Sequence, residues 1–238
     1  MMNSETKKPF LVHLEELRYR IIKSIISVIF FSILGYFLSD YIINLLINPI
    51  YSLPVSFQVL KITSIFSTKI GISFAFGFFI SIPIIIYQIL KFTLPAFRNI
   101  ISWYKVVMFV FLYLLLLIIG ICFGYYVLIP LSIAFFTSLS DGLSFIEINY
   151  TLENYLVYLI WILIISSLIF QLPLVILILT KLNLINRRYL INHRRHIIVS
   201  FFILAAIFTP PDPISQIIVV LPLYILFEFS IFLAKFSK

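Results

Sequence analysis

The segment Val106–Leu131 reads VVMFVFLYLLLLIIGICFGYYVLIPL, and none of its 26 consecutive residues carries a charge. An α-helix rises about 1.5 Å per residue, so a helix of this length can cross a hydrocarbon core of about 30 Å. A surface helix of a soluble domain would instead carry polar residues along one face. The segment therefore predicts a transmembrane helix.

The composition of the whole chain points in the same direction. Hydrophobic residues make up 63% of the 238 residues and charged residues only 11%, and the mean hydropathy is +1.17. A soluble domain is nearer half apolar and a quarter charged, and here too few polar residues remain to cover a surface. The same apolar content excludes intrinsic disorder, and the lone Cys122 excludes a disulfide-bonded scaffold. The sequence indicates a multi-spanning membrane protein.

Six apolar windows predict six transmembrane helices in one all-α domain covering residues 1–238. The fifth window is doubtful, because its twelve residues reach only about 18 Å and would need local thinning of the bilayer. Prolines inside several windows, Pro173 among them, predict kinks. In the third window, Gly120 and Gly124 form a GxxxG pattern that permits close helix contact. A short amphipathic helix over about 9–20 is expected to precede the first span. The expected spans are 21–38, 70–92, 106–131, 155–179, 197–208 and 214–233.

The distribution of Lys and Arg predicts that both termini lie on the inner side. With six spans, the inner segments contain fifteen basic residues and the outer loops only Lys61 and Lys69, which is a clear positive-inside bias. A further apolar stretch, 41–60, is interrupted by asparagines and prolines, and counting it as a span would move the basic residues of 181–195 outside. The net charge of +8 is therefore interpreted as a topology signal, and no nucleic-acid partner is expected.

Polar residues within or beside the spans are the candidate functional positions. Near the N-terminus, the spacings Glu15–Arg18 and Glu16–Arg20 fit ordinary helix-surface ion pairs. The alternative is that the two carboxylates form a site for a cationic ligand. Gln171 and Glu228 lie inside predicted spans, about 12 Å and about 8 Å from the inner end. A lipid-facing glutamate is costly by roughly 2.5–3.5 kcal/mol, so Glu228 should face protein or water. Asp212 can cap the sixth helix or serve a function.

No arrangement typical of an enzyme is present in the sequence. The three histidines, His13, His193 and His196, fall at the predicted inner surface without a nucleophile beside them. The chain has no glycine-rich phosphate loop, no HExxH and no paired intramembrane carboxylates. Neither an enzymatic activity nor a cofactor is therefore expected.

Several stretches, in order along nearly the whole chain, resemble the TatC family, the multispanning receptor subunit of the twin-arginine protein translocase. They are HLEELR at 13–18, PIIIYQ at 83–88 with Leu94–Pro95, FQLP at 170–173, TPPDPISQ at 209–216 and LFE at 226–228. The resemblance implies a protein that binds Arg-Arg signal peptides and moves folded proteins across an energised membrane. It also implies several copies working with single-span partners of the TatA/TatB type.

The resemblance also assigns roles to individual positions. Glu16 and Arg18, with Glu15 beside them, match the motif that binds signal peptides. Six further residues match positions for translocation or partner contact: Pro49, Gln171, Thr209, Asp212, Gln216 and Glu228. There are two departures from the family pattern. The inner loop 93–105 lacks the usual glutamate, and Gln171, which cannot titrate, replaces a glutamate of many bacterial relatives.

One alternative from another class stays open, namely a small ion-coupled transporter that uses Glu228 and Asp212. Such a transporter would take up its substrate alone, whereas the receptor would form complexes with single-span helices and Arg-Arg peptides. The abundance of Ile, Phe, Tyr, Asn and Lys suggests an A+T-rich genome. Both a bacterial plasma membrane and an organelle-encoded protein of mitochondria or plastids fit that composition.

Overall fold

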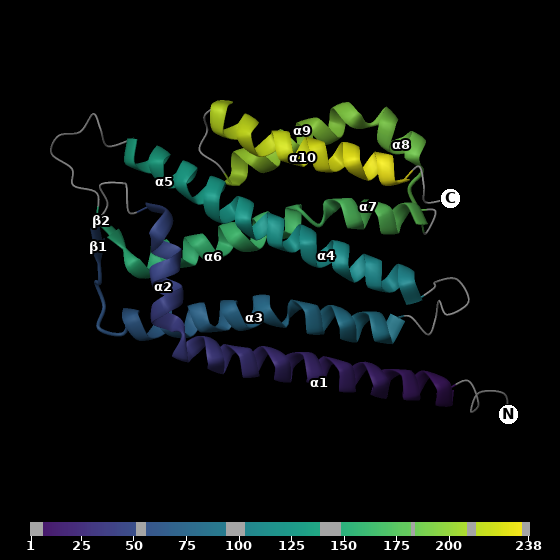
Figure 1. The fold of residues 1–238 in the computed structure, drawn as a ribbon, viewed down its shortest axis with the longest axis horizontal. Helices are drawn as coiled ribbons and strands as arrows, with labels where there is room; N and C mark the ends of the chain where they lie inside the picture. The colour runs from purple at the N-terminus through teal and green to yellow at the C-terminus, as the bar shows by residue number, and fades with distance from the viewer. Residues whose placement is uncertain are drawn as a thin grey trace. The chain divides into compact units, whose positions relative to one another are not determined.

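A computed structural model describes residues 7–50, 56–93, 103–138, 149–181, 184–208 and 213–234. These residues are mostly helical, as predicted (Figure 1). In order, the elements are α1 (Lys7–Phe37), α2 (Ser39–Ile47), the 3₁₀ turn η1 (Asn48–Ile50), β1 (Ser56–Gln58), α3 (Ser64–Thr93), α4 (Trp103–Phe123), the π-helical turn η3 (Gly124–Leu128), α5 (Ile129–Ser138), β2 (Asn149–Thr151), α6 (Leu152–Ile169), α7 (Leu172–Lys181), α8 (Arg187–Asn192), α9 (Arg194–Phe208) and α10 (Pro213–Ala234).

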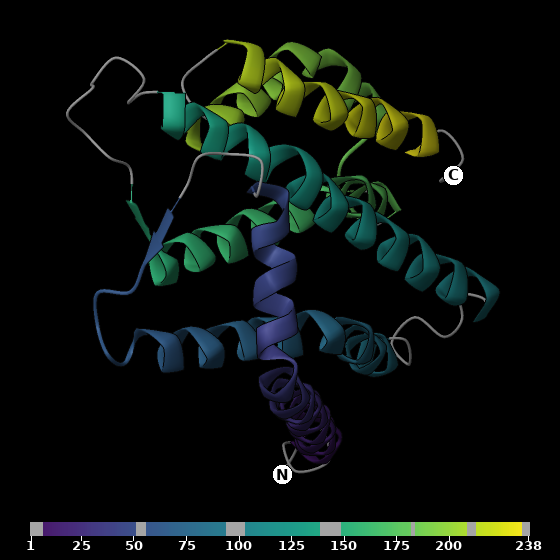
Figure 2. The same cartoon turned by 60° about the vertical axis from the view of Figure 1, so that its left-hand side comes forward.

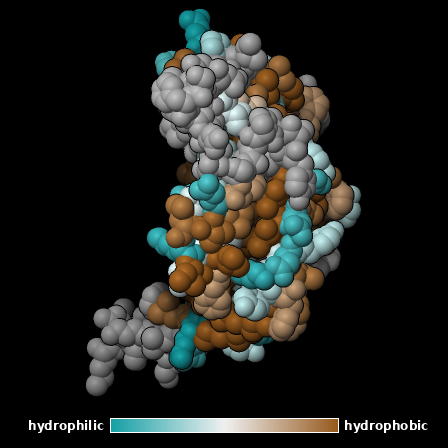
Figure 3. All heavy atoms as spheres, turned by 90° about the vertical axis from the view of Figure 1, so that its left-hand side faces the viewer, coloured by the Kyte–Doolittle hydropathy of each residue, from teal (hydrophilic) through white to brown (hydrophobic). Residues whose placement is uncertain are grey.

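Four of the predicted spans are confirmed as helical segments long and apolar enough to cross a membrane. They cover Leu14–Phe37, Ser64–Phe92, Val106–Ser138 and Leu152–Thr180. The fifth and sixth windows correspond to α9, of 15 residues, and α10, whose shorter apolar stretch is Gln216–Phe232. Large apolar side chains are exposed on many of these helices, and Figure 3 shows such side chains on one face of the molecule. Lipid can cover this surface, as a multi-pass membrane protein requires.

The first helix differs from the expected arrangement. The sequence suggested a short amphipathic helix over 9–20 followed by a separate span, but α1 runs unbroken from Lys7 to Phe37. Pro9 falls within the first turn, where its missing N–H costs nothing, and no glycine or proline occurs between it and Gly35. The polar N-terminal turns are therefore rigidly continuous with the apolar helix.

Contacts divide the chain into two compact units, and each is described by itself. The first contains the described residues of Met1–Asn44 and Lys61–Leu114. Within it α1 and α3 lie side by side (Figures 1 and 2). Close approach is possible because Gly77 faces the backbone of Ser32 and Gly35 faces Ser73 and Phe76. At the end of this pair, Asp40 of α2 forms a 2.7 Å ion pair with Lys69 of α3.

The second unit contains the described residues of Leu45–Leu60 and Leu115–Lys238. Its core includes Ile129, Leu156, Leu159, Leu223 and Phe227, each no more than 2% exposed. Helix α10 packs against α7 and α9, and η3 packs against α6. Strands β1 and β2 form a short parallel pair with Phe57 opposite Tyr150.

Two local predictions for this unit are confirmed. The Gly120 and Gly124 pair allows α6 to approach closely, and the Ser166 hydroxyl donates a 2.6 Å hydrogen bond to the Gly120 carbonyl. The predicted kink at Pro173 appears as a turn at residues 170–171 that separates α6 from α7. Pro173 has no N–H to offer the carbonyl of residue 169, which explains why the helix breaks there.

The segment 41–60 does not form a spanning helix. Helix α2 ends at Ile47 after 9 residues, and η1 follows with Pro49 inside it. Residues 51–55 lie outside the described part of the chain.

Candidate functional site

Helix α1 brings the N-terminal acidic and basic side chains onto a rigid scaffold. Glu16 and Arg20 lie one turn apart, and Arg20 Nε donates a 3.1 Å hydrogen bond to Glu16 Oε1. Arg20 Nη2 donates to the same oxygen. The Arg20 side chain is only 13% exposed and that of Glu16 is 37% exposed. The Glu16–Arg20 pair expected from the spacing is therefore confirmed, with the arginine as the more deeply buried partner.

The neighbouring Glu15 and Arg18 behave differently. Both are exposed, and neither forms an ion pair with another side chain in the described part of the chain. The second pair expected from spacing, Glu15 with Arg18, is therefore absent from these residues. The site offers two carboxylates of different availability, since one is held by an internal guanidinium and the other is open to water.

Pro49 lies in the turn η1, directly after α2. Two tyrosines of the second unit donate hydrogen bonds to the end of α2. In a continued α-helix the N–H of residue 49 would bond to the Leu45 carbonyl, but proline has no N–H. The Tyr125 hydroxyl donates to that same Leu45 carbonyl over 2.6 Å, and Tyr155 donates to the Leu46 carbonyl over 3.2 Å. These two hydroxyl groups satisfy carbonyls that the end of α2 leaves without helical donors.

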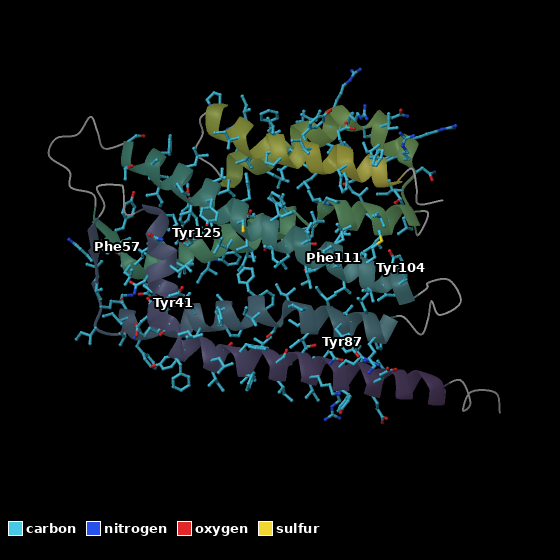
Figure 4. The ribbon with its side chains drawn as sticks, viewed as in Figure 1. Tyr41, Phe57, Tyr87, Tyr104, Phe111 and Tyr125 are labelled. Carbon is cyan, nitrogen blue, oxygen red and sulfur yellow. The ribbon has the colours of Figure 1, made fainter. Side chains whose placement is uncertain are left out.

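Aromatic packing and the strand pair hold the same segment. The rings of Phe57 and Tyr155 lie 4.9 Å apart between centroids, and Figure 4 shows Phe57 and Tyr125 at the same end of this unit. Burial raises the pKa of Tyr150 in β2, and the nearby Tyr158 adds to the shift. A tyrosine is already neutral at pH 7, so this shift extends into the alkaline range the pH over which the Tyr150 hydroxyl stays uncharged beside the β1–β2 pair.

We expect Tyr125→Phe to weaken the fixation of the α2 end, because the Leu45 carbonyl then loses its hydroxyl donor. A net cost of about 0.5–1.5 kcal/mol per lost hydrogen bond is typical. The substitution Pro49→Ala supplies a backbone N–H that can donate to the Leu45 carbonyl. In the double variant Tyr125→Phe/Pro49→Ala, part of the lost stability should therefore return. The measurement is thermal unfolding of the purified protein, with exposed Tyr126→Phe as the control. Equal effects of Tyr125→Phe and Tyr126→Phe would contradict this role.

The remaining predicted positions are spread over the second unit. Gln171 is 7% exposed, at the turn between α6 and α7, and Gln216 is half-buried near the start of α10. Glu228 Oε2 accepts a 2.8 Å hydrogen bond from Arg194 Nη2, which joins α10 to the start of α9. Thr209 and Asp212 lie outside the described residues, as does most of loop 93–105.

Reasoning from sequence missed three residues that complete these arrangements. Arg194 was interpreted only as a flanking charge, and Tyr125 and Tyr155 only as part of apolar spans. The partners of the two tyrosines are 80 and 109 residues away in sequence, so no local spacing could reveal them. For Arg194 the signal was the unpaired Glu228 within a predicted span, which implied a cationic neighbour without identifying it.

The fold and these sites define a class: a polytopic α-helical membrane protein with ionisable groups near the start of its first helix. A family model described as "Sec-independent protein translocase protein (TatC)" matches residues 12–222, and the chain belongs to the TatC family. It is 35% identical to the TatC protein of Carboxydothermus hydrogenoformans, covering 95% of this chain and 92% of that protein. It is 37% identical to a TatC-like protein, ymf16, of Reclinomonas americana, over 95% of this chain and 87% of the relative.

A solved structure supports the same assignment. The crystal structure of the twin-arginine translocase receptor TatC superimposes with a TM-score of 0.76 at 30% identity, covering 94% of this chain and 99% of that one. The resemblance inferred from HLEELR, TPPDPISQ and the other stretches is confirmed. The relatives include bacterial proteins and that of Reclinomonas americana, and the chain is a multi-pass membrane protein.

Proposed function

We propose that this chain is the receptor and core subunit of a twin-arginine protein translocase. It binds Arg-Arg signal peptides and passes folded proteins across an energised inner membrane, together with several copies of single-span partners of the TatA/TatB type. Six spans with both termini inside complete the proposal. The observation that carries it is the pair of adjacent carboxylates, Glu15 and Glu16, on the rigid polar start of α1.

The electrostatics of the proposed inner face support a receptor for arginines. That face has a large excess of Lys and Arg, so a cationic peptide is repelled except where carboxylates are available. Guanidinium–carboxylate hydrogen bonds are charge-assisted and can be bidentate, which favours arginine over lysine. Arg18, exposed beside the two acids, is proposed to shape this site with them. Glu15 is proposed to supply the second carboxylate that loop 93–105 lacks.

Contacts with partner helices are proposed for the other positions that match the family pattern. Pro49 lies in the turn held by Tyr125, and Gln171 is the buried amide at the kink before α7. The members of this set are Pro49, Gln171, Thr209, Asp212, Gln216 and Glu228. Because Gln171 cannot titrate, a proton relay is not proposed there.

The alternative of an ion-coupled transporter using Glu228 and Asp212 is less well supported. Glu228 is already engaged by Arg194 at 2.8 Å, and a neighbouring guanidinium competes with any cation for the carboxylate. We therefore retain the receptor as the conclusion.

The experiment is crosslinking of a radiolabelled Arg-Arg signal peptide to the chain in native membranes, followed by purification of the complex. The proposal predicts specific crosslinks that an unlabelled Arg-Arg peptide competes away and a Lys-Lys peptide does not. It also predicts that single-span membrane proteins co-purify with the chain. Equal competition by the Lys-Lys peptide, or substrate uptake by the purified chain alone, would contradict it.

A further inference from the structure

The connection between α8 and α9 gathers positive charge that the neighbouring sequence does not neutralise. Residues 187–196 include four arginines and two histidines, and no Asp or Glu occurs between Glu153 and Asp212. Glu228 of α10 engages Arg194. Four exposed basic side chains form no ion pair with any residue that the structure describes. They are Arg187, Arg188, Arg195 and His196, which we call the basic cluster.

We propose that the basic cluster binds the phosphate groups of anionic phospholipids. A guanidinium can donate two parallel hydrogen bonds to a phosphate. Each Lys or Arg close to an anionic lipid surface strengthens the attraction about fivefold. The inference goes beyond the proposed function and does not depend on it, because it requires only that the chain is a multi-pass membrane protein.

The cluster lies at a place where lipid headgroups are expected. The candidate span Leu152–Thr180 ends shortly before α8, and the apolar part of α9 begins at Ile197. The segment between them carries the charge that each apolar helix lacks, so it belongs at the bilayer surface. Figure 1 shows α8 beside α9 and α10 at one end of this unit.

Packing holds the cluster on a fixed base. Helix α8 contacts α9 and α10, and its Leu190 is buried. At the joint between α8 and α9, the rings of Tyr189 and His193 stack with 4.0 Å between centroids. His193 Nδ1 also donates a 2.8 Å hydrogen bond to the Tyr189 carbonyl. Because the joint is already ordered, binding an anion there costs little rearrangement of the chain.

Apolar side chains beside the cluster favour a lipid over a soluble anion. Tyr189 of α8 and Val199 of α9 are both more than half exposed. A phospholipid can place its phosphate against the arginines while its acyl chains cover apolar surface, which a soluble anion cannot do. Charge that served only to direct membrane insertion would need no bound ligand. It would therefore give no preference for anionic lipid in the folded protein.

The test uses the purified protein reconstituted in phosphatidylcholine vesicles that contain a photoactivatable lipid. The probe is either phosphatidylglycerol or phosphatidylcholine, with the same acyl chains and with the reactive group beside the phosphate. Both leaflets contain the probe, so the orientation of the protein does not affect the result. Labelling within 184–200, measured by mass spectrometry, should be about tenfold or more stronger with phosphatidylglycerol.

Removal of the three arginines should abolish most of this preference. In Arg187→Gln/Arg188→Gln/Arg195→Gln, we expect labelling by the two probes to differ by about twofold or less. The corresponding triple lysine variant keeps every positive charge, so most of the preference should remain. That variant and the unaltered protein keep the inference testable if the glutamine variant does not fold.

A matched control removes the same charge from elsewhere in the chain. The triple variant Lys23→Gln/Lys61→Gln/Lys91→Gln changes three exposed side chains outside the cluster. The preference for phosphatidylglycerol within 184–200 should be unchanged in this control. An equal loss there would overturn the inference, since net charge alone would then explain the effect.

Three further outcomes would overturn the inference without bearing on signal-peptide binding. Equal labelling by the two probes in the unaltered protein would leave the cluster with a role in insertion only. A loss of preference in the lysine variant as complete as that in the glutamine variant would exclude attraction by charge. Competition by inorganic phosphate, beyond that of sodium chloride at the same ionic strength, would assign the cluster to a soluble anion.

Discussion

Gly77→Ala is expected to force α1 away from α3 and to remove most of the folded protein from the membrane. A Cβ atom at this position would lie 2.5 Å from the backbone nitrogen of Ser32 and 2.7 Å from its Cα. These are backbone atoms that no rotamer change can move, so the helices must separate. Overpacking of this kind typically costs 1–3 kcal/mol or more. The measurement is the amount of protein in isolated membranes and its unfolding temperature in detergent.

The control for this substitution is on the same helix. A Cβ added at Gly71 meets no atom within 4 Å, so Gly71→Ala should leave both quantities unchanged or slightly improved, given the higher helix propensity of alanine. Normal abundance and stability of Gly77→Ala would show that the α1–α3 contact is not as close as described.

Arg194→Glu is expected to have the second largest effect, because it places two carboxylates where the 2.8 Å ion pair between α9 and α10 now lies. Glu228 Oε1 is buried and forms no hydrogen bond within the described part of the chain, so a repelled carboxylate could not easily turn elsewhere. Breaking a fully buried pair costs about 3–5 kcal/mol. These side chains are 42% and 31% exposed, so we expect a smaller loss of stability, about 1–3 kcal/mol. The measurement is the fall in unfolding temperature.

The charge-swapped double variant, Arg194→Glu with Glu228→Arg, isolates the pairwise contribution. Most of the lost stability should return, because opposite charges again face each other at the same place. Arg195→Glu, an exposed neighbour on the same helix, is the matched single control and should change stability little. Failure of the swap to recover stability would mean that the pair does not join the two helices.

Much of the fold could be predicted from the sequence because lipid imposes simple requirements. Long uncharged segments such as Val106–Leu131 have to be helical, since only internal hydrogen bonds satisfy the backbone in a bilayer. The missing N–H of Pro173 likewise predicted the break between α6 and α7. The asparagines and prolines within 41–60 explain why α2 ends early. The continuity of α1 was missed because a change in side-chain polarity was interpreted as a boundary, although the backbone needs no break there.

The tertiary partners of the candidate site could not be predicted in the same way. The Glu16–Arg20 pair followed from helical spacing, but its unequal burial depends on packing that a one-dimensional pattern does not contain. Tyr125 reaches Leu45, and Arg194 reaches Glu228, across long separations in sequence. Such contacts are fixed by how helices pack, and a single sequence shows only that suitable side chains exist.

The central claim is that the carboxylates at the start of α1 hold the arginines of a signal peptide. Glu16→Gln alone is an ambiguous test, because it leaves the nearly buried Arg20 without its carboxylate. The most direct measurement is therefore photo-crosslinking in native membranes from a probe beside the Arg-Arg pair, in the unaltered protein and in Glu15→Gln/Glu16→Gln/Arg20→Gln. The control for lost acidic charge is Glu153→Gln. The account predicts at least a tenfold fall in crosslinking for the triple variant and no fall for the control. The reason is that each charged hydrogen bond contributes about 1.5–3 kcal/mol. Unchanged crosslinking in a triple variant of normal abundance would mean that the arginines are bound elsewhere.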